Sequence, residues 1–197
     1  AFIVPGLIML SIMTTSVNFA AFGIYLPKYN GSIFEIMSAP ISAYEIVIGY
    51  AGAAVSKSIL ISVLILFTST IFVDFYIKHP LLMLFLLILI SITFSLFGFI
   101  VGIWATNFEK LQLIPLLIIT PLVFLGGSFY SVEMLPELWQ FVTKFNPIFY
   151  VINGFRWSFF GTADIAITTS LSFMITFLFI CLIIIGLIFK TGYRIKG

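Results

Sequence analysis

The chain has 197 residues, of which 62% are hydrophobic and only 8% are charged, whereas about a quarter of the residues of a soluble domain are charged. A water-soluble fold of this size could not bury so much apolar surface, so the composition excludes an ordinary soluble domain. The net charge of +2 is small and scattered, which gives no indication of a nucleic-acid partner.

Five apolar stretches are long enough to cross a bilayer, which takes about 20 residues in a helix. They are apolar on all sides and lack the alternation of barrel strands. We therefore expect an all-α, polytopic helical membrane protein that forms a single transmembrane domain over residues 1–197. The expected spans are residues 2–26, 45–73, 80–105, 111–127 and 169–189.

Basic residues predict the orientation of the spans. If the first connector is cytoplasmic, six basic residues lie inside and three outside, which satisfies the positive-inside rule and makes the C-terminus cytoplasmic. The inside set is Lys28, Lys57, Lys110, Lys190, Arg194 and Lys196, and the outside set is Lys78, Lys144 and Arg156. The chain begins AFIVP, without Met or a basic flank, so we expect a sixth span upstream; a cleaved signal peptide is the alternative.

The first connector, residues 27–44, contains two capping-box patterns. Ser32 followed by Glu35 predicts the start of one helix, and Ser42 followed by Glu45 predicts the start of the next. Pro40 separates them because it cannot continue a helix. We expect a short helix over residues 33–39, which needs a packing partner to be stable. That partner is either a docked protein or the headgroup region of the membrane.

Lys57 lies inside the second span, where a charged side chain is costly. We expect it to snorkel to the inner boundary, and the alternative is that it faces a wet interior. His79 and Cys181 have no neighbouring metal ligand or catalytic partner in the sequence, so we assign no metal site.

Residues 128–168 are too rich in Gly, Pro and charge to form another span. Leu138, Phe141 and Phe145 recur at helical spacing after Pro136, and residues 148–160 form a second, aromatic-rich half-helix. We expect two short re-entrant outer helices before the last span, forming a cap on the bundle or the outer end of a translocation path. A plain aromatic belt is the alternative. The candidate path residues are Phe129, Tyr130, Trp139, Tyr150, Arg156 and Trp157.

No catalytic constellation is present in the sequence. It contains no GxxxxGK[ST] phosphate loop, no paired carboxylates within a span and no usable Ser/His/Asp set. We therefore expect no catalytic residue and no cofactor bound by this chain, and any ATP would be hydrolysed by another protein.

Three stretches resemble a known family. VPGLIMLSIMTTS, GSIFEIMSAPIS and TPLVFLGGSFYSVEMLPELWQFVTKFNPIFYVINGFRWSFFG are similar to the permeases of type-two ABC exporters, in the bacterial branch that exports drugs, capsule polysaccharides and lipo-oligosaccharides. The resemblance implies six spans per subunit after an N-terminal interfacial helix, a location in the bacterial inner membrane, and export of an amphipathic substrate.

The resemblance also implies partners. Two permease copies, expected to form a homodimer, would assemble with two copies of a separate ABC ATPase that binds the ATP and Mg²⁺. It assigns the first connector to ATPase contact, through Ser32, Ile33, Phe34, Glu35, Ile36 and Met37. Two other classes remain open. A membrane-embedded enzyme acting on lipid would need an acid-base pair, and an ion-coupled carrier would need charges at mid-depth in several spans.

Overall fold

The structure is a computed structural model, and it describes residues 2–192. Five helices in this part of the chain are long and apolar enough to cross a membrane. Four of them are continuous: α1 (Ile3–Asn30), α3 (Ala43–Phe72), α4 (Pro80–Trp104) and α9 (Ile167–Thr191). The fifth runs through α5 (Phe108–Leu113), the π-helix η1 (Ile114–Ile119) and α6 (Thr120–Leu125). The expected all-α fold with five spans is confirmed, with boundaries within four residues of those expected.

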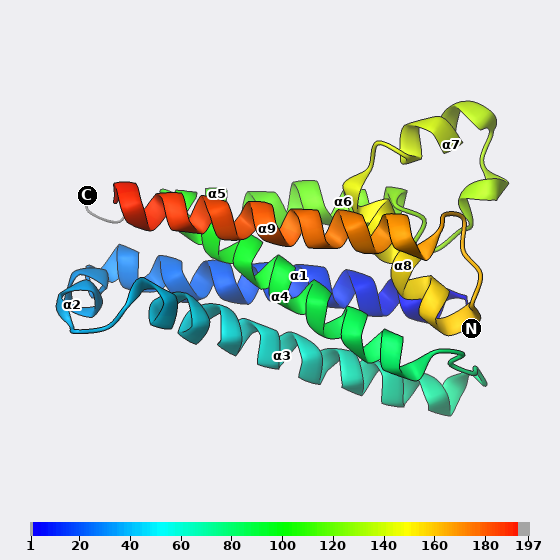
Figure 1. The fold of residues 1–197 in the computed structure, drawn as a ribbon, viewed down its shortest axis with the longest axis horizontal. Helices are drawn as coiled ribbons and strands as arrows, with labels where there is room; N and C mark the ends of the chain where they lie inside the picture. The colour runs from blue at the N-terminus through cyan, green and yellow to red at the C-terminus, as the bar shows by residue number, and fades with distance from the viewer. Residues whose placement is uncertain (1, 193–197) are drawn as a thin grey trace.

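The long helices lie side by side along the longest axis of the molecule (Figure 1). The short helix α2 (Ile33–Ser38) and the last turn of α9 lie at one end, which we call the α2 end. The start of α1 lies at the opposite end with α7 (Glu137–Thr143) and α8 (Pro147–Phe160), and we call this the α7 end. The short 3₁₀-helix η2 (Val132–Met134) precedes α7.

Helix α1 is at the centre of the bundle and packs most extensively on α4. Gly98 and Gly102 allow this contact, because a Cβ atom built on Gly98 would lie 2.5 Å from the carbonyl oxygen of Val17, and one built on Gly102 would overlap that of Ala21. This is the small-residue packing that brings membrane helices into backbone contact. The GxxxG spacing of the two glycines in an apolar span is the sequence feature that could have predicted this contact.

The first helix extends beyond the expected end. Residue 26 was the expected boundary, but α1 continues through Pro27 and ends at Asn30, before Gly31 in the left-handed region with φ 82°. The extra turn is held by tertiary contact. The Lys28 ammonium donates hydrogen bonds to the carbonyl oxygens of Ile103 and Ala105 at the end of α4, the latter at 3.0 Å. A cation there also complements the negative end of the α4 dipole.

The fifth span is distorted at its centre by η1. Pro115 and Pro121 each lack the backbone N–H that an α-helix needs, so the hydrogen-bond ladder must change register. The backbone N–H of Thr120 donates to the Pro115 carbonyl, and so does the Thr120 hydroxyl at 2.9 Å. Such π segments occur often at functional sites, and this one lies beside α1.

Candidate functional site

One of the two predicted capping boxes forms. The Ser42 hydroxyl accepts a hydrogen bond from the backbone N–H of Glu45, and the Glu45 carboxylate accepts one from the backbone N–H of Ser42. The Ser32 box was a wrong prediction, because the Ser32 side chain makes no cap hydrogen bond. Backbone carbonyls take the place of this cap. The Gly31 carbonyl accepts a hydrogen bond from the backbone N–H of Phe34, and the Ser32 carbonyl accepts those of the next two residues of α2.

The candidate coupling residues divide between two faces of α2. Ile33 is only 4% exposed and packs in a cluster with Ile24 and Ile46, so it fastens α2 to the bundle. Ile36 and Met37 are half-buried against the same cluster. Phe34, by contrast, is 55% exposed, and Ser32 and Glu35 are also exposed. The surface of α2 that another protein could contact is therefore centred on Phe34, and Ile33 does not belong to it.

The outer segment contains the two expected helices; both begin within a residue of the expected positions, but α7 ends at Thr143, before Phe145. Helix α8 packs on α9, α4 and α1, whereas α7 contacts mainly η2 and stands away from the bundle (Figure 1). The side chains of Leu138, Phe141 and Phe145 are all exposed, so they do not face the bundle of this chain. This apolar face is therefore available to lipid or to a partner, and entry of α7 into the membrane stays a prediction.

Two of the six candidate path residues line a common pocket. Tyr130 and Trp139 lie on a cavity of about 650 Å³ between α6 and α7. Burial raises the pKa of the Tyr130 phenol, whose hydroxyl donates to the Leu125 carbonyl at 3.1 Å. The pocket is otherwise lined by Leu122, Leu125, Leu135, Pro136, Val142, Thr143, Phe145 and Asn146. An amphipathic ligand would meet mostly apolar side chains there.

The remaining aromatic candidates make separate contacts. Phe129 stacks on Phe124, with ring centroids 4.9 Å apart. Tyr150 stacks on Phe173 of α9, and Trp157 stacks on His79, just before α4, at 4.6 Å. The Tyr150 and Trp157 rings join α8 to neighbouring elements, whereas Phe129 packs on α6, so the structure does not bring the six candidates together.

Arg156 does not line a path either, because it is only 4% exposed. Its guanidinium donates to the Gly127 carbonyl and lies 4.2 Å from the centroid of the Phe2 ring. Burial lowers the pKa of this guanidinium, and the negative charge of Asp164 opposes the shift. The Asp164 carboxylate in turn accepts a hydrogen bond from Ser131. This Arg156 network joins α8 to the turn after α6 and to the loop before α9.

A polar groove between α1 and the fifth span was not expected from the sequence. Its volume is about 360 Å³, and it is lined by Thr14, Asn18, Gln112, Pro115, Leu116 and Thr120. The side-chain amides of Asn18 and Gln112 make no hydrogen bond to another described residue. Both amides lie within helices of membrane-spanning length. Unpartnered polar groups are costly in lipid, so this groove is a candidate for the path of a polar group. The sequence feature that could have predicted this groove is the position of these two amides within apolar spans.

Lys57 lies beside the same part of α1. Its Nζ is 3.2 Å from the centroid of the Phe19 ring, near the middle of both α3 and α1. The ammonium therefore packs on α1, and its extension toward the inner boundary stays a prediction. Phe19 directly follows Asn18 of the groove, so the cation and the groove lie at the same level along α1, on neighbouring sides of the helix about 100° apart. We call these two sides together the open face of α1.

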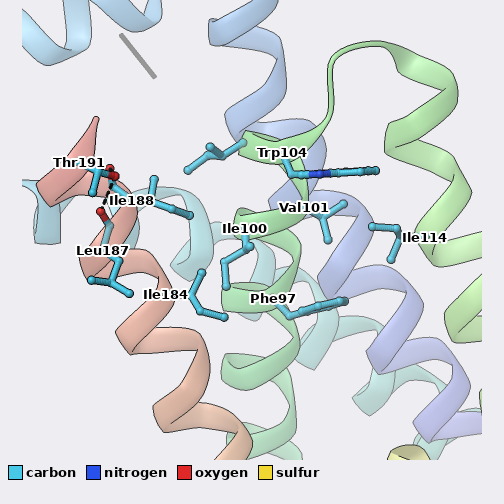
Figure 2. A pocket seen from close by; sticks show the side chains of 10 residues that line it. Phe97, Ile100, Val101, Trp104, Ile114, Ile184, Leu187, Ile188 and Thr191 are labelled. Atoms are coloured by element: carbon cyan, nitrogen blue, oxygen red, sulfur yellow. Dashed lines mark hydrogen bonds between the residues drawn. The ribbon is translucent and has the colours of Figure 1, made fainter. Parts of the chain in front are cut away.

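A third cavity lies at the α2 end, between α4, α9 and η1 (Figure 2). Its volume is about 550 Å³. Apart from Thr191 and the Trp104 indole, the side chains that line it are apolar, among them Phe97, Ile100 and Leu187. This composition provides no group for acid-base or nucleophilic chemistry. Within residues 2–192, no group of three His, Cys, Asp or Glu side chains could hold a metal ion.

Two comparisons with known proteins identify the family of this chain. The model of the ABC-2 type transporter family matches residues 1–160. The inner membrane transport permease YadH of Escherichia coli K12 is 36% identical over 177 residues, which cover 90% of this chain and 69% of YadH. The YadH protein of Shigella flexneri matches to the same extent. These relatives are named as transport permeases and not as enzymes. The chain belongs to the ABC-2 type transporter family and is a permease of that family.

Proposed function

We propose that this chain is the membrane-spanning subunit of an ATP-driven exporter of the bacterial inner membrane, with its α2 end and C-terminus in the cytoplasm. The end of α1, helix α5 and the end of α9, which contain Lys28, Lys110 and Lys190, lie at the α2 end. Lys78 precedes α4 and Lys144 follows α7, at the α7 end. This distribution supports the orientation through the positive-inside rule. Arg194 and Lys196, which we also expect inside, lie outside the described residues.

The observation that carries the proposal is the exposure of Phe34 on a short helix that Ile33 fastens to the bundle. A separate ATPase would dock on Phe34 and bind ATP and Mg²⁺. Closure of the ATPase dimer would then move α2 and, through Ile33 and the capped start of α3, the bundle itself. Two permease copies would move relative to each other and open a path for an amphipathic substrate.

The path in this proposal follows the polar groove and the open face of α1 toward the pocket at the α7 end. A second copy of the chain would face this side, so that each copy provides one wall. Two rival classes remain for comparison. A lipid-modifying enzyme is disfavoured because the relatives are named transport permeases, and an ion-coupled carrier would transport without ATP.

The test is a Phe34→Asp variant of the full-length protein, reconstituted with its ATPase. We expect the variant to fold and insert as the wild type does but to lose substrate-stimulated ATP hydrolysis and transport, because a charge replaces the apolar contact. Phe34→Leu should retain both activities. Met134→Asp is the matched control, because Met134 is also exposed but lies in η2, which contacts α7 and not α2. Coupled ATP hydrolysis by Phe34→Asp would refute the docking site.

A further inference from the structure

Lys57 presents a positive charge at a depth where the chain provides no carboxylate. It lies near the middle of α3, a helix of 30 residues, and its side chain is exposed. Neither α1 nor α4 contains an acidic residue, and the only one in α3 is Glu45 in its first turn. The Phe19 ring partly stabilises the ammonium by a cation–π contact. An isolated cation at this depth normally marks a binding site or a pathway.

A second copy of the sequence would not neutralise Lys57 either. The seven acidic residues lie at helix ends, in short helices or in loops: Glu35, Glu45, Asp74, Glu109, Glu133, Glu137 and Asp164. None of them lies at the middle of a long helix. The counter-charge must therefore come from something other than these residues.

The surroundings of Lys57 suit the polar end of an amphiphile. The side-chain amides of Asn18 on α1 and Gln112 on α5, which line the polar groove, have donors and acceptors that no other described residue uses. Phe19 and Leu116 provide apolar surface beside them. A cation, two amides and apolar side chains are what an anionic headgroup with an attached hydrocarbon part would contact.

We propose that Lys57 is a specificity-determining residue that selects amphiphiles with an anionic headgroup, such as a phosphate, sulfate or carboxylate. The headgroup binds between Lys57 and the Asn18 and Gln112 amides, and the hydrocarbon part lies against Phe19. This inference rests on the proposed function, because it gives the charge class of the exported substrate.

The test compares two probes with the same fluorescent acyl chain, lysophosphatidylglycerol (anionic) and lysophosphatidylcholine (zwitterionic). Binding is measured on the full-length protein in phosphatidylcholine nanodiscs, with empty nanodiscs as the blank. We expect the wild type to bind the anionic probe about tenfold more tightly, the size of one charge-assisted hydrogen bond. Lys57→Gln should abolish this preference, and Lys57→Arg should retain it. Lys190→Gln, which removes a charge from the end of α9, should leave it unchanged.

Equal binding of the two probes by the wild type would overturn the inference. So would a preference that persists in Lys57→Gln, which would mean that Lys57 faces lipid or pairs with a carboxylate elsewhere in the protein. ATP-dependent movement of the anionic probe is measured separately in proteoliposomes that contain the ATPase. Charge-selective binding without such movement would support the site and refute the proposed function.

Discussion

Arg156 donates a hydrogen bond to the backbone carbonyl of Gly127, 29 residues earlier in the chain. The contact joins α8 to the turn that follows α6. Gly127 itself has a positive φ of 82°, so this turn depends on a residue without a Cβ atom. A charged donor thus holds in place the start of the segment that leads to α7 and its pocket.

We expect Arg156→Met to lower the free energy of unfolding by about 2–3 kcal/mol, because a buried hydrogen bond from a charged group is lost. The Gly127 carbonyl and the Asp164 carboxylate would also lose a positive neighbour. Thermal unfolding in detergent is the measurement, with Lys144→Met as the exposed control. Because Asp164 acts on Arg156 through charge, Asp164→Asn should cost less in the Arg156→Met background than in the wild type. Equal unfolding temperatures for Arg156→Met and the wild type would show that the network is not structural.

Gly98→Ala should destabilise the bundle by about 1–3 kcal/mol, the usual cost of overpacking a tight contact. The added methyl group would meet the Val17 backbone of α1, which cannot move as a side chain could. Gly49→Ala is the matched control, because a Cβ atom there meets open space, and alanine favours the helix by about 1 kcal/mol. The comparison of the two unfolding temperatures decides: if Gly98→Ala is as stable as Gly49→Ala, the α1–α4 contact is looser than described.

Ser42→Ala should weaken the start of α3 by about 1 kcal/mol, because the capping box is lost. Ser32→Ala should have little effect, since the Ser32 side chain makes no cap hydrogen bond. Hydrogen exchange of the first amides of α3 is the direct measurement, and Glu45 should exchange faster only in Ser42→Ala. Faster exchange in both variants, or in neither, would contradict this assignment.

Labelling with an impermeant thiol reagent from outside tests the position of α7. In native membranes of a Cys181→Ser background, we expect Glu137→Cys and Lys144→Cys to react and Phe141→Cys and Phe145→Cys to be protected. All four positions are exposed in this chain, so the protection must come from lipid or from a partner. Detergent extraction should expose the two phenylalanine positions if lipid covers them. Uniform labelling in membranes would show that α7 lies free in water.

The sequence by itself determined the helices of this protein. Apolar length located the five spans, Ser42 and Glu45 located the start of α3, and Pro136 and Pro147 located the starts of the two outer helices within a residue. These signals are local, because hydrocarbon thickness, a missing N–H group or a capping side chain acts on neighbouring residues only.

The tertiary structure alone decided which side chains meet. Helices α1 and α3 are apolar around most of their circumference, so periodicity does not indicate which face packs inward. The Lys28 hydrogen bonds that extend α1 past Pro27, the burial of Ile33 and Arg156, and the polar groove all depend on residues distant in the chain. Lys57 was identifiable from the sequence as a costly charge. Only the rotation of α3 against α1 placed it over Phe19 at mid-depth, because that rotation is set by packing between helices and not by the sequence around Lys57.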